Sequence, residues 1–208
     1  MVKVKICGIT NLGDAATAAR LGADMLGFNF CEKSPRFITP NAARDIIREL
    51  TASTLNIGVF VDESEDTVVK IAETTGLSGI QLHGNESPDL VSKLRARTKL
   101  FVIKALRVGP DFLPETAAEF ETDAILLDAY SPSVYGGTGE MFDWKVAKTV
   151  KYRTKRLFLA GGLKPGNVAD AVSLLRPFAV DVASGVESSP GIKDPKRVES
   201  FIRIAKQA

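Results

Sequence analysis

The feature of this sequence that most limits its fold is a regular alternation of short apolar segments with longer segments of helical periodicity. The apolar runs are rich in Val, Ile, Leu and Ala, which is typical of parallel strands with both faces buried. Eight such units follow one another without a linker, and they predict a single (β/α)₈ TIM barrel with a parallel eight-stranded sheet over residues 1–208. The predicted strands begin near Val2, Met25, Leu55, Gly79, Lys99, Ala124, Arg156 and Ala179.

Local signals between the apolar runs support the predicted helices. Thr39 and Ser87 are N-cap residues, and each precedes a proline at the first helical position. Gly22 and Gly76 follow helical stretches, as C-terminal glycines do. A doubly wound sheet is the rival architecture, because it shares the alternation. That fold usually has a glycine-rich turn after its first strand, whereas the glycine-rich turns here come late in the chain.

The bulk composition narrows the expected partners and location. A net charge of +2 is too small to indicate nucleic acid or a membrane surface as a partner. The chain has no uninterrupted apolar run of membrane-spanning length, and its N-terminal segment lacks the apolar core of a signal peptide. Two cysteines are too few for a disulfide framework, so we expect a cytoplasmic protein. A monomer and a homodimer are both compatible with the sequence.

Active sites of this barrel lie at the carboxyl ends of its strands. The first and sixth predicted strands end in Cys7 and Asp128, a thiol and a carboxyl group that could serve one small substrate as base and acid. We expect Lys104 and Arg107, near the end of the fifth strand, to be solvated surface charges. The other polar or glycine residues at strand ends are Cys31, Asp62, His83, Gly161, Gly162, Ser184 and Gly185.

Glycines cluster late in the chain, where this fold often binds phosphate. Gly161 and Gly162 end the seventh strand, and Ser184 and Gly185 end the eighth. Glycine lets backbone N–H groups approach an anion closely, although it is also the ordinary residue of tight turns. A further segment that contains Gly137 follows the sixth strand and could close over the same group. Together these segments predict a small phosphorylated ligand.

Short motifs are spread along nearly the whole chain. They are Lys5-Ile6-Cys7-Gly8-Ile9-Thr10, Ser34-Pro35-Arg36, Gly58-Val59-Phe60-Val61, Gln81-Leu82-His83-Gly84, Leu127-Asp128, Gly136-Gly137-Thr138-Gly139, Phe142-Asp143-Trp144, Leu159-Ala160-Gly161-Gly162-Leu163, Asn167-Val168, Ser184-Gly185-Val186-Glu187 and Gly191-Ile192-Lys193-Asp194. Taken together, these motifs resemble phosphoribosylanthranilate isomerase of tryptophan biosynthesis, and they occur in that family's order. Cys31 departs from the family's pattern, and we assign it no role.

The resemblance implies an Amadori rearrangement of N-(5-phosphoribosyl)anthranilate, in which a ring-closed aminoaldose becomes an open-chain aminoketose. The reaction requires an acid that protonates the ring oxygen and a base that removes the proton from C2 of the sugar. The resemblance implies Asp128 as the acid, and the apolar residues before it suggest that desolvation raises its pKa. It implies Cys7 as the base. The reaction needs no metal and no organic cofactor.

The strand periodicity adds a prediction about the surroundings of Cys7. Lys5 lies on the same strand face as Cys7, so an inward Cys7 places the Lys5 ammonium inside the barrel, where it needs a partner. The eighth strand neighbours the first in a closed barrel and carries Asp181. We therefore expect a buried Lys5–Asp181 pair that favours the Cys7 thiolate. Asp181 could instead contact the sugar hydroxyls of the substrate.

Two further residues gain expected roles from the resemblance. Arg36 would hold the anthranilate carboxylate, because a guanidinium can bind a carboxylate through two hydrogen bonds. His83, the only histidine in the chain, would position the substrate from the cavity wall.

Two other functions remain open from the residues alone. A Schiff-base aldolase on the same barrel would need a desolvated lysine at a strand end, for which Lys104 is the candidate. A barrel that only binds a phosphorylated ligand would need neither Cys7 nor Asp128.

Overall fold

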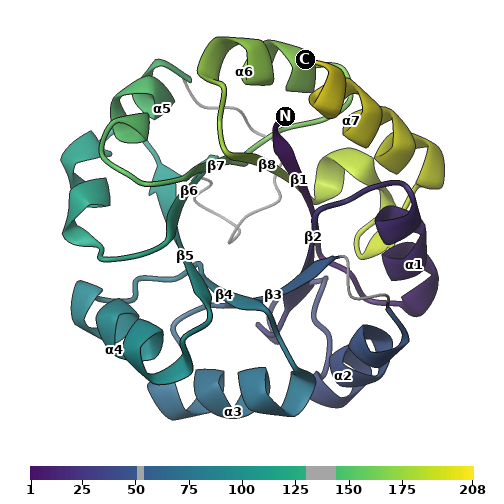
Figure 1. Ribbon diagram of the computed structural model, residues 1–208, viewed down its shortest axis with the longest axis horizontal. Coiled ribbons are helices and arrows are strands. Elements are labelled where there is room, and N and C mark those ends of the chain that lie inside the picture. The colour runs from purple at the N-terminus through teal and green to yellow at the C-terminus, as the bar shows by residue number, and fades with distance from the viewer. Residues whose placement is uncertain (51–53, 130–143) are drawn as a thin grey trace.

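The computed structural model describes residues 1–50, 54–129 and 144–208. Eight parallel strands pair in chain order and close into a barrel, with helices packed around it (Figure 1). The predicted fold class is confirmed, and each strand begins within two residues of its predicted start. The strands are β1 (Lys3–Cys7), β2 (Met25–Asn29), β3 (Leu55–Phe60), β4 (Gly79–Leu82), β5 (Phe101–Val108), β6 (Ala124–Ala129), β7 (Leu157–Leu159) and β8 (Ala179–Val182).

The surrounding helices begin and end at the signals expected from the sequence. The side chains of Thr39 and Ser87 accept hydrogen bonds from backbone N–H groups in the first turns of their helices. Gly76 ends its helix in the left-handed conformation with φ 73°. The helices are α1 (Leu12–Arg20), α2 (Pro40–Glu49), α3 (Glu65–Thr75), α4 (Pro88–Thr98), α5 (Trp144–Lys151), α6 (Val168–Leu175) and α7 (Pro195–Gln207). Among the residues described, no helix is long and apolar enough to span a bilayer.

Two connections differ from the predicted strand–helix repeat. Between β5 and β6 the chain forms the 3₁₀ helix η1 (Pro114–Glu119), with extended residues on both sides in place of a longer α-helix. After β8 it forms the one-turn η2 (Ser184–Val186) and then an antiparallel hairpin of β9 (Glu187–Ser189) and β10 (Ile192–Lys193). Gly191 has φ 82° in the turn of this hairpin, a conformation that favours glycine. The hairpin precedes α7.

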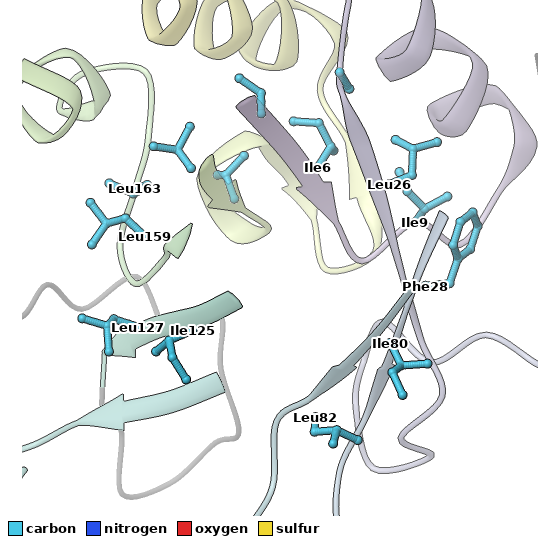
Figure 2. Packing of buried hydrophobic residues seen from close by; sticks show 14 of the residues in the cluster. Ile6, Ile9, Leu26, Phe28, Ile80, Leu82, Ile125, Leu127, Leu159 and Leu163 are labelled. Atoms are coloured by element: carbon cyan, nitrogen blue, oxygen red, sulfur yellow. The ribbon is translucent and has the colours of Figure 1, made fainter. Parts of the chain in front are cut away.

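The apolar side chains form two clusters, one on each side of the barrel wall. The larger cluster lies between the strands and the helices, and Figure 2 shows part of it, including Ile6 and Leu26 on neighbouring strands. The smaller cluster fills the barrel interior with residues such as Leu126 and Phe158. Side chains alternate between the two faces of a strand. Because Ile6 packs in the outer cluster, Lys5 and Cys7 face the interior, as predicted.

Candidate active site

A cavity opens at the carboxyl ends of the strands and encloses about 620 Å³, its open mouth included. It brings together most of the predicted site residues, although they come from strands and loops far apart in the sequence. Gly185 adjoins the cavity without lining it, and Gly137 lies outside the described residues. The predicted residues that line the cavity are Cys7, Arg36, His83, Asp128, Gly161, Gly162, Asp181 and Ser184.

Lys5 and Asp181 form the buried ion pair that the strand periodicity predicted. They are direct register partners on β1 and β8, and Lys5 Nζ lies 3.0 Å from Asp181 Oδ1. The Lys5 side chain has no exposed surface. Burial by itself lowers the pKa of Lys5, but the negative charge of Asp181 and the adjacent Cys7 outweigh it, so the pKa lies above its ordinary value. Lys5 therefore stays charged beneath the cavity.

The expected activation of Cys7 is only partly confirmed. Burial raises the pKa of the Cys7 thiol, Lys5 lowers it, and Asp181 raises it again. The net effect is a pKa above the ordinary thiol value. Lys5 favours the thiolate as expected, but it does not overcome the desolvation.

The opposing effects of burial, Lys5 and Asp181 on the pKa of Cys7 predict how its thiol reacts with an alkylating agent. Only the thiolate reacts, so in a Cys31→Ser background the alkylation rate is expected to rise about tenfold per pH unit up to a pH above about 8.5, the ordinary thiol pKa. Lys5→Met removes a charge that lowers the pKa of Cys7, so the same curve is expected to shift to higher pH. Iodoacetamide kinetics followed by mass spectrometry measure both curves. A shift to lower pH in Lys5→Met would contradict this electrostatic account.

Two glycines make room for the site, and the sequence reasoning missed both. A Cβ atom on Gly27 of β2 would lie 2.6 Å from Cys7 Sγ and 3.1 Å from Lys5 Nζ. A Cβ atom on Gly8, which has φ 77°, would lie 2.5 Å from Arg36 Cδ. Any larger residue at either position would displace a proposed functional side chain. Gly8 lies within the matching segment that contains Cys7, but neither glycine was given a role from the sequence.

Asp128 is held at the end of β6 through both of its carboxyl oxygens. The backbone N–H of Ala129 donates to Asp128 Oδ1 over 2.9 Å. His83 Nε2 lies 3.1 Å from Asp128 Oδ2, and His83 Nδ1 lies 2.9 Å from Nε2 of Gln81. The imidazole of His83 therefore sits between Gln81 and Asp128 in the cavity wall.

Arg36 is fixed by a network that the sequence did not predict. Its Nε and Nη2 atoms donate to the two carboxylate oxygens of Glu187 over 2.9 and 2.7 Å. Lys193 donates to Glu187 Oε1 over 2.7 Å and also to the backbone carbonyl of Cys7. Burial would raise the pKa of Glu187, but hydrogen bonds from Arg36 and the charge of Lys193 lower it below its ordinary value. The β9–β10 hairpin thus ties the loop after β2 to the end of β1.

The two glycines after β7 adopt the left-handed backbone conformation. Gly161 and Gly162 have φ values of 76° and 68°, which glycine adopts without strain. A Cβ atom on Gly161 would lie 2.5 Å from the backbone nitrogen of Ala129, and one on Gly185 would overlap the carbonyl oxygen of Leu163. Gly161 therefore lets the segment after β7 lie against the end of β6, and Gly185 lets the segment after β8 lie against the segment after β7.

Lys104 is buried, so the expectation that it is a solvated surface charge is wrong. Its side chain is 2% exposed, and its ammonium donates to Glu86 over 2.7 Å and to the carbonyl of Gly84 over 2.8 Å. Burial lowers its pKa below the ordinary value. Lys104 lies within β5 and does not line the cavity, so the arrangement does not favour a Schiff-base aldolase. In the described part of the chain, no group of three or more His, Cys, Asp or Glu could hold a metal ion.

A parallel eight-stranded barrel, with a cavity at the carboxyl ends of its strands that is lined by titratable side chains, places the protein among the (β/α)₈-barrel enzymes. The sequence model of the family "N-(5'phosphoribosyl)anthranilate (PRA) isomerase" matches residues 4–204, and the chain belongs to this family.

Individual relatives agree over their full lengths. The N-(5'-phosphoribosyl)anthranilate isomerase of Geobacter sp. is 52% identical over 208 residues, which is 100% of this chain and 99% of the relative. The crystal structure of the Thermotoga maritima isomerase has a TM-score of 0.92 and 43% identity, with both chains covered completely. Another solved isomerase, at TM-score 0.88, 42% identity and complete coverage of both chains, is in complex with reduced 1-(o-carboxyphenylamino)-1-deoxyribulose 5-phosphate.

Proposed function

We propose that the protein isomerises N-(5'-phosphoribosyl)anthranilate to 1-(2-carboxyphenylamino)-1-deoxyribulose 5-phosphate, a step of tryptophan biosynthesis. The observation that carries this proposal is the meeting of Cys7 and Asp128 in one cavity, in a chain of the isomerase family. A solved relative binds a reduced form of this product, which agrees with the proposed substrate class.

The reaction needs one proton donor and one proton acceptor. Asp128 donates a proton to the ring oxygen of the ribose as the bond from that oxygen to C1 breaks, and the nitrogen lone pair forms the imine. The Cys7 thiolate then removes the proton from C2, and the electron pair moves to the imine to give an enolamine, which tautomerises to the ketone. Lys5 favours the thiolate that this step requires. Acid–base catalysis of this kind contributes about 10²–10⁴-fold for each group.

The two anionic ends of the substrate fit two parts of the cavity. Arg36 uses Nε and Nη2 for Glu187, so its Nη1 side is available for the anthranilate carboxylate. Gly161, Gly162, Ser184 and the adjacent Gly185 form the proposed phosphate cradle. His83 and Asp181 also line the cavity and are proposed to contact the sugar.

A fluorescence assay tests this function directly. Purified protein is mixed with enzymatically generated phosphoribosylanthranilate, and consumption of the fluorescent substrate is followed together with chromatographic detection of the ketose product. We expect turnover in the absence of added metal or organic cofactor. Absence of the ketose product, with the protein shown to be folded, would refute the proposed function.

Arg36→Lys separates the two anionic subsites. Lysine keeps a positive charge beside Glu187 but loses the planar pair of donors, so KM is expected to rise about tenfold or more, as for loss of a charge-assisted hydrogen bond. Ribose 5-phosphate lacks the anthranilate group, and its inhibition constant is expected to stay within about twofold of wild type. Steady-state kinetics with this competitor measure both values. Equal weakening of substrate and competitor would place Arg36 outside the carboxylate subsite.

Cellular location and assembly stay predictions. A cytoplasmic location suits a biosynthetic enzyme whose Cys7 and Cys31 are both free thiols. One solved structure is of monomers generated from the dimeric isomerase of Thermotoga maritima, and a homodimer or a monomer is proposed for this chain. Sedimentation velocity distinguishes the two.

A further inference from the structure

Glu187 and Lys193 are buried charged side chains that have no role in the function proposed above. Both belong to the β9–β10 hairpin, and their side chains are only 4% and 2% exposed. Neither lines the cavity. A buried ion pair is costly to form and contributes little stability compared with apolar residues of the same volume. A role other than stability is therefore indicated for this pair.

Glu187 determines which edge of the Arg36 guanidinium is left for a ligand. Its carboxylate accepts from Nε and Nη2 of Arg36 over 2.9 and 2.7 Å. Nη1 of Arg36 has no hydrogen-bond partner among the described residues, and it is not a buried atom. The stem of Arg36 lies against Gly8, where a Cβ atom would be 2.5 Å from Cδ. Both ends of this cavity-lining side chain are therefore held in place.

Lys193 restores the positive charge that Glu187 cancels. A guanidinium that is already paired with one carboxylate attracts a second carboxylate only weakly. The Lys193 ammonium lies 2.7 Å from Glu187 Oε1, so the carboxylate of Glu187 is shared between two cations. Two cations and one carboxylate leave one positive charge, which matches the single negative charge of an anthranilate carboxylate.

Lys193 also connects the guanidinium of Arg36 to the end of β1. Its ammonium donates to the backbone carbonyl of Cys7, and the hydroxyl of Thr10 donates to the carbonyl of Gly191 in the same hairpin over 2.6 Å. A continuous series of contacts therefore runs from Arg36 through Glu187 and Lys193 to Cys7. It holds the guanidinium and the backbone of Cys7 in one arrangement.

We propose that Glu187 and Lys193 are positioning residues that make the cavity select ligands with an anthranilate carboxylate. Glu187 directs Nη1 of Arg36 toward the ligand, and Lys193 supplies the charge that keeps this edge attractive to an anion. Neither residue touches the ligand. The inference rests on the proposed role of Arg36 in carboxylate binding, but it concerns binding and is independent of proton transfer.

Two unreactive ligands that differ only in the carboxylate test this selection. One is reduced 1-(o-carboxyphenylamino)-1-deoxyribulose 5-phosphate, and the other is the same compound without its carboxyl group. In calorimetric titrations the wild type is expected to bind the first about tenfold or more tighter than the second. Equal affinities, or binding of neither ligand, would overturn the inference. Discrimination by a protein that shows no turnover would support it and would refute only the proposed reaction.

Glu187→Gln separates geometry from charge. The substitution makes the site more positive, but its amide NH₂ group cannot accept a hydrogen bond from Arg36. If Glu187 positions Arg36, the carboxylated ligand is expected to bind about tenfold or more weaker, while the ligand without a carboxyl group stays within about twofold of wild type. If charge alone mattered, the carboxylated ligand would bind more tightly. A gain, no change or an equal loss for both ligands would contradict the proposal.

Lys193→Gln removes the charge and keeps a donor for Glu187 and for the carbonyl of Cys7. Burial lowers the pKa of Lys193 below its ordinary value, so the titrations are made near neutral pH. The carboxylated ligand is expected to bind about tenfold weaker, with the other ligand unchanged. Undiminished discrimination in Lys193→Gln would overturn the proposal. This variant and the wild type still decide if Glu187→Gln does not fold.

Ser188→Ala is the matched control in the same hairpin. Ser188 is exposed, and its hydroxyl donates to the carbonyl of Ile192 over 3.3 Å without contacting Arg36. Both ligands are expected to bind this variant within about twofold of wild type. A loss of discrimination as large as that of Glu187→Gln would mean that any disturbance of the hairpin suffices, and the specific role of Glu187 would be wrong.

Discussion

Asp128→Asn is expected to lower kcat by about 10²–10⁴-fold while KM for phosphoribosylanthranilate changes little. Asparagine has nearly the same shape and can still accept from the N–H of Ala129, so the end of β6 keeps its geometry. It has no proton to give to the ring oxygen, and ring opening then depends on water. Steady-state kinetics compare the two proteins.

Asp62→Asn is the matched control for this substitution. Asp62 is also an acidic residue near the end of a strand, but it does not line the cavity, and its side chain accepts from the backbone of Asn85. We expect kcat of this variant to stay within about twofold of wild type, as is usual for substitutions away from a site. Near-normal turnover by Asp128→Asn would place the acid on another residue.

Cys7→Ser is expected to reduce kcat by a similar factor of about 10²–10⁴ with ligand binding retained. The serine hydroxyl is slightly smaller than the thiol and far less acidic, so Lys5 cannot supply a useful population of the alkoxide. Removal of the C2 proton then becomes the slow step. Substrate deuterated at C2 is expected to show a larger isotope effect on kcat with Cys7→Ser than with wild type.

The isotope effect also distinguishes the two proposed roles. Asp128→Asn slows ring opening, which precedes removal of the C2 proton, so its isotope effect is expected to be smaller than that of Cys7→Ser. Cys31→Ser is the matched cysteine control, because Cys31 lies in the loop after β2 outside the cavity. A large isotope effect confined to Asp128→Asn would mean that Asp128, and not Cys7, removes the C2 proton.

The sequence predicted those features that follow from periodicity. The ends of the strands, and therefore Cys7 and Asp128, could be located because apolar runs alternate with capped helices. The Lys5–Asp181 pair followed from strand alternation and from the closure of the barrel between β1 and β8. These inferences need only the order of elements and the direction of side chains.

Contacts between side chains that have no periodic relation to each other were not predicted. Burial of Lys104 depends on Glu86, which lies in the loop after β4 and has no periodic relation to it. The ion pair between Arg36 and Glu187 depends on the β9–β10 hairpin, which is too short to give an alternating sequence pattern. The balance of burial and charge that raises the pKa of Cys7 depends on distances that a sequence does not contain.

The hairpin after β8 has a consequence for when the protein becomes active during its synthesis. A nascent chain that has emerged from the ribosome only as far as β7 lacks Asp181, Glu187 and Lys193. At that stage the Lys5 ammonium and the Arg36 guanidinium have not yet met the acidic partners that hold them in the finished barrel. The cavity is therefore completed late in synthesis, because Lys5 on β1 and Arg36 after β2 need acidic partners that lie after β7.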